Sequence, residues 1–344
     1  MISSAWTILP DPRPMNKRDT LLALLALSTI PLAARAQQRG KLWRIVVLTS
    51  SKPDETPESD AYGMAFVAEM ATAGFTFGTD YTLEVRSLDV YERLPAQANE
   101  PATQNADIII PVSPLSAAIA RRATRTIPIV CVAVHDPVGM GYAASLARPG
   151  GNLTGLVTFY AELIPKQLEL VKSILRKKAS RVAMLENSKV IGAGPDITQK
   201  IQEAAQTLGI RLQVVPVDSP AQLPQAFAAM KRERADAFIT VADEMFYLER
   251  RQLAELALKQ RLPSLFATRE NVEAGGLMSY GEDSLEKFAQ AAKFVSKIMK
   301  GAKPGDLPIE QPTKFQLTIN RKTAKAIKLA IPQELLLRAD RLID

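Results

Sequence analysis

The sequence predicts an α/β fold of two similar Rossmann-like lobes with parallel sheets, joined by a multi-segment hinge. Three observations predict it. Short β-branched runs alternate with helical segments almost from end to end, which is typical of parallel sheets covered by helices. The alternation restarts once, after a glycine-rich stretch in the middle of the chain. Stretches rich in glycine and proline at 149–155, 275–281 and 301–308 predict three passages between the lobes, and several passages make a hinge.

Residues 1–36 precede the lobes and end in a segment with the pattern of a cleavable secretory signal peptide. The basic Asn16-Lys17-Arg18 is followed by an apolar run over 21–32 and by the small residues of Ala34-Arg35-Ala36. The run has about a dozen residues, whereas a membrane-spanning helix needs roughly 20. We therefore expect export to the periplasm, cleavage after Ala36 and a mature chain that is not membrane-embedded. Whether Met1 or Met15 is the true start stays open.

Lobe 1 is predicted to comprise residues 41–154 and 277–305. The continuous apolar character of segments such as Ile108-Ile109-Ile110 fits strands that are buried on both faces. The predicted strands are 43–49, 82–87, 107–112 and 127–134, with helices near 60–74, 91–105 and 115–124.

Lobe 2 is predicted to comprise residues 155–276 and 306–344. Its helices are expected at 160–178, 196–208, 221–233 and 246–260, and its strands at 181–185, 211–217, 236–241 and 263–267. A strand-like piece near 275–281 and a helix at 283–300 follow. The tail adds a strand at 315–320 and helical turns around 322–328 and 333–342.

Composition excludes several classes of protein. The chain has one histidine and one cysteine, so a His/Cys metal site is excluded, and Cys131 in the apolar run 127–134 is expected to be a buried thiol. The formal charge of +7 falls to +5 without residues 1–36. Its basic clusters are interleaved with acids and lack the aromatic residues of a stacking platform. We expect no nucleic-acid partner, no metal and no cofactor.

Candidate ligand-binding residues come directly after the strands, because ligands of open α/β sheets bind outside the carboxyl ends of the strands. In lobe 1 these are Ser50, Ser113 and Asp136. Ser113 precedes a helix, so it either receives a carboxylate together with the free amides or serves as an ordinary N-cap. Asp136 precedes Pro137 and either contacts the ligand or only forms a turn.

In lobe 2 the equivalent residues are Asn187, Asp243 and Glu270. The two acids either touch the ligand or cap the helices that follow. Tyr160, next to Phe159 and just past the first crossing, either stacks on an apolar solute or packs in the hinge. Carboxylates on one lobe facing hydroxyls and amides on the other would suit a zwitterion. The expected partner is a small-molecule solute, and a neutral aromatic one held mainly by Tyr160 and Phe159 stays open.

Two catalytic interpretations fail on the sequence. His135 beside Asp136 suggests a triad with Ser113, but adjacent residues of an extended loop point apart, and no Gly-x-Ser-x-Gly elbow surrounds Ser113. The segment 139–144 matches the loose dinucleotide fingerprint, but Pro149 stops a following helix too soon for that motif. We therefore expect no enzyme.

Three long motifs resemble one family. They are Arg148-Pro149-Gly150-Gly151-Asn152-Leu153-Thr154-Gly155 after Asp136-Pro137-Val138-Gly139, then Glu273-Ala274-Gly275-Gly276-Leu277-Met278-Ser279-Tyr280-Gly281, and Leu307-Pro308-Ile309-Glu310-Gln311-Pro312-Thr313-Lys314-Phe315. They closely resemble those of ABC-transporter substrate-binding proteins with the type I periplasmic binding fold. The resemblance implies capture of a small solute in the cleft between the lobes and delivery to an ABC permease in the inner membrane.

The resemblance leaves the solute open, because some relatives bind amino acids and others aromatic compounds. Val112-Ser113-Pro114 and Asn187-Ser188 depart from the pattern of many relatives at two ligand loops. A ligand-sensing subunit for a membrane receptor is the alternative function, since the same fold serves both, and an exported hydrolase is the third. The oligomeric state is open.

Overall fold

The computed structural model describes residues 41–49, 61–87, 103–158, 160–175, 180–187 and 195–344. Trp43–Asp344 form one compact unit. The expected signal peptide therefore lies outside the described residues, as does most of the helix expected at 91–105. Within the described part of the chain, no helix is long and apolar enough to cross a bilayer.

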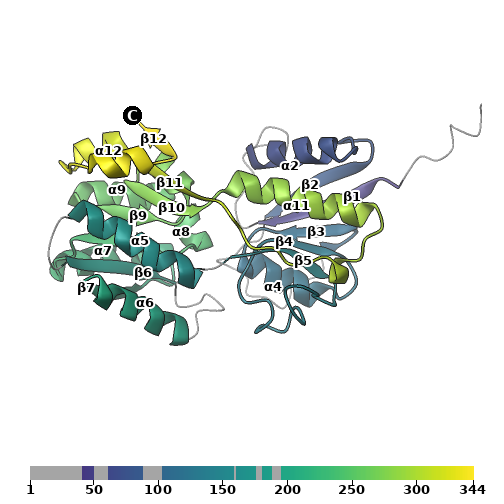
Figure 1. Cartoon of the computed structure of the whole chain (residues 1–344), viewed down its shortest axis with the longest axis horizontal. Coiled ribbons are helices and arrows are strands. Elements are labelled where there is room, and N and C mark those ends of the chain that lie inside the picture. The colour runs from purple at the N-terminus through teal and green to yellow at the C-terminus, as the bar shows by residue number, and fades with distance from the viewer. Residues whose placement is uncertain (1–40, 50–60, 88–102, 159, 176–179, 188–194) are drawn as a thin grey trace, which may run out of the picture. The chain divides into compact units, whose positions relative to one another are not determined.

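A first, all-parallel sheet has the strand order β2-β1-β3-β4-β5 (Figure 1). Alternate residues of its strands enter two separate cores, so Ile45 and Val47 face one layer of helices while Val46 and Leu48 face the other. Helices α2 and α11 cover the first face and α4 the second. The elements of lobe 1 are β1 (Trp43–Thr49), α2 (Ala61–Thr72), β2 (Tyr81–Ser87), β3 (Ile108–Pro111), α4 (Pro114–Ala123), β4 (Ile129–Val134), β5 (Leu153–Val157) and α11 (Ser284–Met299).

A second sheet has the order β12-β11-β10-β9-β8-β6-β7. Its strands are parallel except at the β10–β11 pair, which is antiparallel. The elements of lobe 2 are α5 (Tyr160–Leu175), β6 (Ser180–Glu186), α6 (Pro195–Thr207), β7 (Ile210–Pro216), η2 (Pro220–Gln222), α7 (Leu223–Arg232), β8 (Ala237–Thr240), α8 (Glu244–Leu248), α9 (Arg250–Gln260), β9 (Ser264–Phe266), α10 (Arg269–Glu273), β10 (Met278–Glu282), β11 (Phe315–Asn320), α12 (Arg321–Ala326), α13 (Gln333–Arg338) and β12 (Arg341–Ile343).

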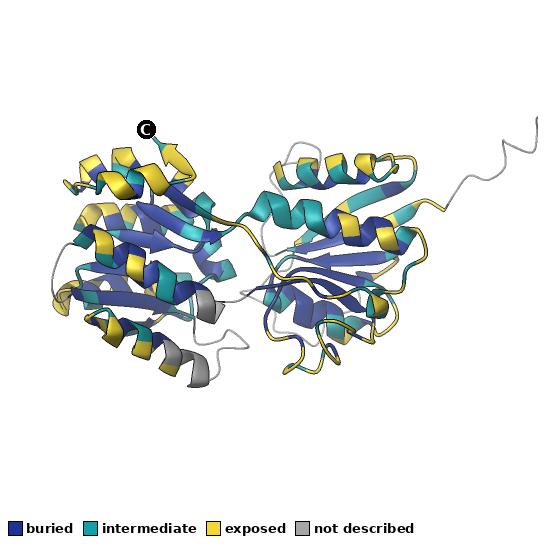
Figure 2. Cartoon of the chain, viewed as in Figure 1, coloured by how far each residue is buried: buried dark blue, intermediate teal, exposed yellow. Residues whose placement is uncertain are grey.

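Lobe 2 also has a core on each face of its sheet. Val182, Met184 and Ile239 pack with the helices α5 and α6, whereas Ala183 and Phe238 pack with α7, α8 and α9. Figure 2 shows the result, with buried strands between helices whose outer faces are exposed. Two-sided burial explains why the strands are continuous apolar runs rather than alternating ones, and it confirms the predicted α/β fold of two similar layered lobes.

Several elements differ from the expectation, and the helix expected at 246–260 is divided at Glu249 into α8 and α9. Residues 153–157 form β5, where only a crossing loop was expected. The strand was not predicted because it is short and contains Gly155. The short helix α10, which follows β9, is not among the helices expected for lobe 2. The helical turns expected over 333–342 end at Arg338, and Arg341–Ile343 instead pair with β11 at the edge of the sheet.

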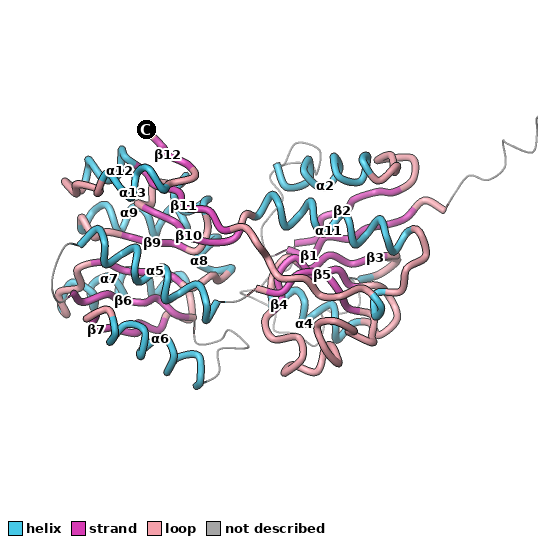
Figure 3. The backbone as a smooth tube through the Cα atoms, viewed as in Figure 1, coloured by secondary structure: helices cyan, strands magenta, loops and turns pink. Residues whose placement is uncertain are grey.

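Three chain segments connect the lobes: the link from β5 to α5, the turn from β10 to α11, and residues 307–314, which follow the 3₁₀ turn η3 (Pro304–Asp306) (Figure 3). The third segment runs along β5, because Val157 N donates to Glu310 O at 3.0 Å and Glu310 N donates to Gly155 O at 2.8 Å. The division at residues 154/155 and 276/277 stays a prediction, but the strand pairings would place both crossings slightly later, after β5 and after β10.

Candidate functional site

Five of the predicted site residues lie shortly after parallel strands, at the carboxyl ends of the two sheets, and the last of them, Glu270, lies in the first turn of α10. Ser113 and Asp136 follow β3 and β4 in lobe 1, and Asn187, Asp243 and Glu270 follow β6, β8 and β9 in lobe 2. Ser50 lies outside the described residues. Tyr160 begins α5, but its side chain is not among those described, nor is that of Phe159.

Ser113 is the N-cap of α4. Its hydroxyl accepts a hydrogen bond from Ser116 N at 3.2 Å, and Ser113 N donates to the Ser116 hydroxyl at 2.9 Å, so the two serines form a reciprocal capping box. Ser113 is buried, which means that the capped helix start is fixed before any ligand arrives.

Asp136 shapes a turn. Its Oδ1 accepts a hydrogen bond from Gly139 N at 2.9 Å, and its backbone has a φ of +32°. The side chain is exposed, and the neighbouring Gly139 has no room for a Cβ because that atom would overlap the Asp136 carboxylate. The turn-forming alternative therefore accounts for the local geometry of Asp136, and ligand contact by Asp136 stays a prediction.

Asn187 and Asp243 are brought together from separate strands. Asn187 Nδ2 donates to Asp243 Oδ2 at 3.2 Å, while Asp243 Oδ1 accepts from Met245 N at 2.9 Å and caps α8. Burial is the largest influence on the pKa of Asp243 and raises it, although the hydrogen bond from Asn187 partly opposes the shift. Both carboxylate oxygens thus have a protein partner.

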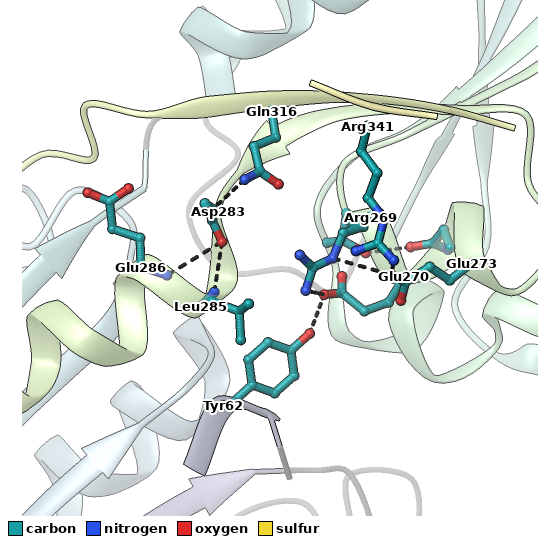
Figure 4. A network of polar contacts seen from close by, with 11 residues as sticks. Tyr62, Arg269, Glu270, Glu273, Asp283, Leu285, Glu286, Gln316 and Arg341 are labelled. Carbon is teal, nitrogen blue, oxygen red and sulfur yellow. Dashed lines mark hydrogen bonds and ion pairs between the residues drawn. The ribbon is translucent and has the colours of Figure 1, made fainter. Parts of the chain in front are cut away.

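Glu270 has a different environment. Its Oε1 accepts a hydrogen bond from the hydroxyl of Tyr62, a residue of α2 in lobe 1, and lies 3.7 Å from Arg269 Nη2 (Figure 4). The side chain is only 11% exposed. Its Oε2 is buried and has no hydrogen-bond partner among the described residues. A buried carboxylate oxygen without a donor is costly, and such an exception in a cleft-forming fold points to a ligand.

Arg269 is the cation beside this carboxylate. It also lies 3.5 Å from Glu273, whose carboxylate is shared with Arg341 at 3.2 Å. The Arg269 side chain is 17% exposed, so α10 presents a largely buried guanidinium and a largely buried carboxylate side by side. A small pocket is lined by both, together with Glu282 from the end of β10 and Gln316 from β11.

Tyr62 is a candidate that the sequence analysis missed. It lies in the first turn of a helix rather than after a strand, so the strand-end rule did not select it. Its aromatic ring stacks on Phe288 of α11, with ring centroids 5.3 Å apart. An aromatic residue at the start of the first helix after β1 was the one available signal.

A second polar cluster lies at the crossings. Thr158 Oγ1 donates to Glu282 Oε2 at 3.3 Å, and Lys287 Nζ donates to the same oxygen at 2.9 Å. The buried His135 has its Nδ1 3.2 Å from Thr158 O, and burial lowers the pKa of His135 to about 4. His135 is therefore neutral near pH 7 and belongs to the hinge, while Ser113 and Asp136 are engaged in their own cap and turn rather than in a triad.

No group of metal-ligating side chains occurs in the part of the chain that the structure describes. Cys131 is a free, fully buried thiol, as expected, and burial raises its pKa. A more open hollow between α6 and β7 contains none of the candidate residues. The candidate binding site therefore consists of the Asn187–Asp243 pair and of Glu270 with Arg269 and Tyr62.

Comparison with known sequences and structures agrees with this fold. The ABC transporter substrate binding protein family matches residues 86–343, which is most of the chain. The chain belongs to this family, whose members bind solutes for ABC transporters and are generally periplasmic or extracellular.

Individual relatives share only low sequence identity with this chain. The chain is 24% identical to a tyrosine-binding protein of Clostridioides difficile strain R20291 over 284 residues, or 80% of this chain and 79% of the relative. A conserved domain protein from Vibrio cholerae superposes with a TM-score of 0.76 at 25% identity, covering 88% of this chain and all of that one. An ABC domain in complex with L-Trp from Streptococcus pneumoniae superposes with a TM-score of 0.77 at 21% identity and the same coverage.

Proposed function

We propose that this substrate-binding protein captures an aromatic amino acid between its lobes and delivers it to an ABC permease in the inner membrane. The observation that carries the proposal is the buried Oε2 of Glu270, which has no hydrogen-bond partner among the described residues and lies on a side chain adjacent to Arg269. An ammonium group supplies the missing donor, and a guanidinium favours a carboxylate. The names of two relatives, one tyrosine-binding and one bound to L-Trp, agree with an aromatic zwitterion.

The other candidate residues are assigned as follows. Ser113 offers its hydroxyl and the start of α4 from lobe 1, and Asn187 with Asp243 forms a preorganised polar pair in lobe 2. Ser50, Asp136 and Tyr160 remain proposed contacts on the strand-end argument alone. The protein holds the solute without converting it, so the solute should be recovered unchanged after incubation.

The proposal is tested by titration calorimetry with L-tyrosine, L-tryptophan and L-phenylalanine, each beside analogues that lack the ammonium or the carboxylate. A charged hydrogen bond contributes roughly 1.5 to 3 kcal/mol, so loss of the ammonium should weaken binding about ten- to hundredfold. Glu270→Gln should weaken binding of the amino acid by a similar factor, with little change in the melting temperature of the unliganded protein. Failure of all three amino acids to bind would refute the aromatic class.

Asp136→Asn is the matched comparison, because it makes the same acid-to-amide change at an exposed carboxylate of lobe 1. We expect it to weaken binding less than Glu270→Gln does, because the exposed Asp136 carboxylate already accepts a hydrogen bond from Gly139 N. Weaker binding by Asp136→Asn together with parent-like binding by Glu270→Gln would move the ammonium site to lobe 1.

Export is proposed on residues 16–36 alone, with cleavage after Ala36. N-terminal sequencing of the processed protein should begin at Gln37. A processed chain that begins well away from Gln37 would contradict this assignment.

A further inference from the structure

Tyr62 is attached to lobe 1 through its ring and to lobe 2 through its hydroxyl. The ring stacks on Phe288 with an interplanar angle of 27°, so a residue of α2 packs on a residue of α11, and these two helices pack against each other on the first sheet. The hydroxyl donates to Glu270, which lies in α10 beside the second sheet. One side chain of lobe 1 therefore contacts a side chain of lobe 2 directly (Figure 4).

The hydroxyl is a permanent donor in this environment. Burial, followed by the negative charge of Glu270, raises the pKa of Tyr62 far above its usual value. The proton therefore stays on the tyrosine oxygen, which donates a charge-assisted hydrogen bond to Oε1 of Glu270. Such a bond fixes the rotation of the carboxylate about its last side-chain torsion.

The two oxygens of Glu270 thus have different roles. Oε1 faces Tyr62 and the guanidinium of Arg269, while Oε2 is buried and has no hydrogen-bond partner among the described residues. A carboxylate held through one oxygen presents the other in a fixed direction, and preorganisation of this kind raises affinity by lowering the ordering cost on binding.

We propose that Tyr62 is a positioning residue that couples lobe closure to ligand recognition: it holds Glu270 through Oε1, so that Oε2 faces the ligand, and it joins the lobes at that point before the ligand binds. The recognition half of this inference rests on the proposed function, whereas the lobe-joining half does not. Because apparent affinity scales with the fraction of molecules in the binding-competent state, Tyr62 strengthens binding both by orienting Glu270 and by populating the joined form.

The test uses Tyr62→Phe, which keeps the ring on Phe288 and removes only the donor. Binding of the best amino acid from the calorimetric series should weaken about tenfold, and small-angle scattering should give a larger radius of gyration for the unliganded variant than for the unliganded parent. The matched control is Tyr81→Phe, because the Tyr81 hydroxyl is buried in lobe 1 without a hydrogen-bond partner among the described residues. That variant should match the parent in affinity and in radius of gyration.

A double-mutant cycle distinguishes positioning from a general structural effect. If Tyr62 acts through Glu270, Tyr62→Phe should weaken binding less than about threefold in the Glu270→Gln background, since the charge that it positions is already gone. Equal weakening in both backgrounds would overturn the positioning role. An unchanged radius of gyration for unliganded Tyr62→Phe would overturn the lobe-joining role.

The two proposals fail differently. Parent-like binding by Glu270→Gln would refute the ammonium site of the proposed function and, with it, the recognition role of Tyr62. The radius of gyration of unliganded Tyr62→Phe would still decide whether the Tyr62–Glu270 hydrogen bond joins the lobes.

Discussion

Gln316 Nε2 donates a hydrogen bond of 2.6 Å to Asp283 Oδ2. Asp283 lies in the crossing between β10 and α11, while Gln316 is the second residue of β11 in lobe 2. The other carboxylate oxygen of Asp283 accepts from Leu285 N at 3.0 Å and from Glu286 N at 3.4 Å. One carboxylate thus begins the helix of lobe 1 and fastens it to a strand of lobe 2.

Asp283→Ala should remove both functions and lower the free energy of unfolding by about 1 to 2 kcal/mol, the usual range for a lost N-cap. Asp283→Asn should keep most of that stability, because the Asn oxygen still caps α11 and the Gln316 amide can turn its oxygen toward the new amide group. Urea unfolding of both variants measures the difference. Equal losses for Ala and Asn would mean that the negative charge, rather than the hydrogen bonds, is what stabilises the start of α11.

Asp243 should make stability pH-dependent in the acidic range. Burial raises the pKa of Asp243 in the folded protein above its unfolded value near 3.9. Between those two values the folded state holds a proton that the unfolded state has lost, so this group makes the free energy of unfolding fall as pH rises through the window and stay level above it. Asp243→Asn keeps an oxygen for Met245 N and has no such titration.

The measurement is the free energy of unfolding of Asp243→Asn minus that of the parent between pH 3 and 7. The difference should shift in favour of the variant as pH rises through the window. A shift in the opposite direction would show that the hydrogen bonds from Asn187 and Met245 outweigh burial and lower the pKa of Asp243.

Much of this fold could be predicted because its strands are buried on both faces. Ile108, Ile109 and Ile110 are fully buried in alternate cores, and a run of that kind is visible in sequence without any partner. The short edge strand β12 and the strand β5 gave no such signal. Each is defined by pairing with residues distant in sequence, as Leu153 is with Ile129 and Thr318 with Arg341.

The candidate site was also predictable only in part. The strand-end rule selected Asn187 and Asp243, which do meet, and Glu270, whose carboxylate has a free oxygen among the described residues. It did not select Tyr62, because the Tyr62–Glu270 contact depends on how α2 approaches α10, and the two residues are 208 positions apart. Local sequence patterns indicate which residues end a strand, but not which residues of the other lobe face them.

Gly155 is a position where both backbone conformation and backbone packing should oppose a substitution. It has a φ of +116°, it pairs with Cys131 in the β4–β5 ladder, and a Cβ added to it would overlap the backbone of Cys131. Its carbonyl also accepts from Glu310 N in the third crossing segment. Gly155→Ala should therefore lower the free energy of unfolding by about 3 kcal/mol or more, from backbone strain and displacement of β5 together.

Gly74→Ala is the matched control, since Gly74 also has a positive φ, +91°, but a Cβ there would meet no atom within 4 Å. It should cost only the conformational penalty of about 1 to 2 kcal/mol. Urea denaturation of both variants gives the comparison. Similar losses at the two sites would mean that β5 shifts to accommodate the methyl group and that the close approach to Cys131 does not constrain residue 155; a distinctly larger loss at Gly155 would show that the glycine is required because β4 and β5 leave no space for a side chain.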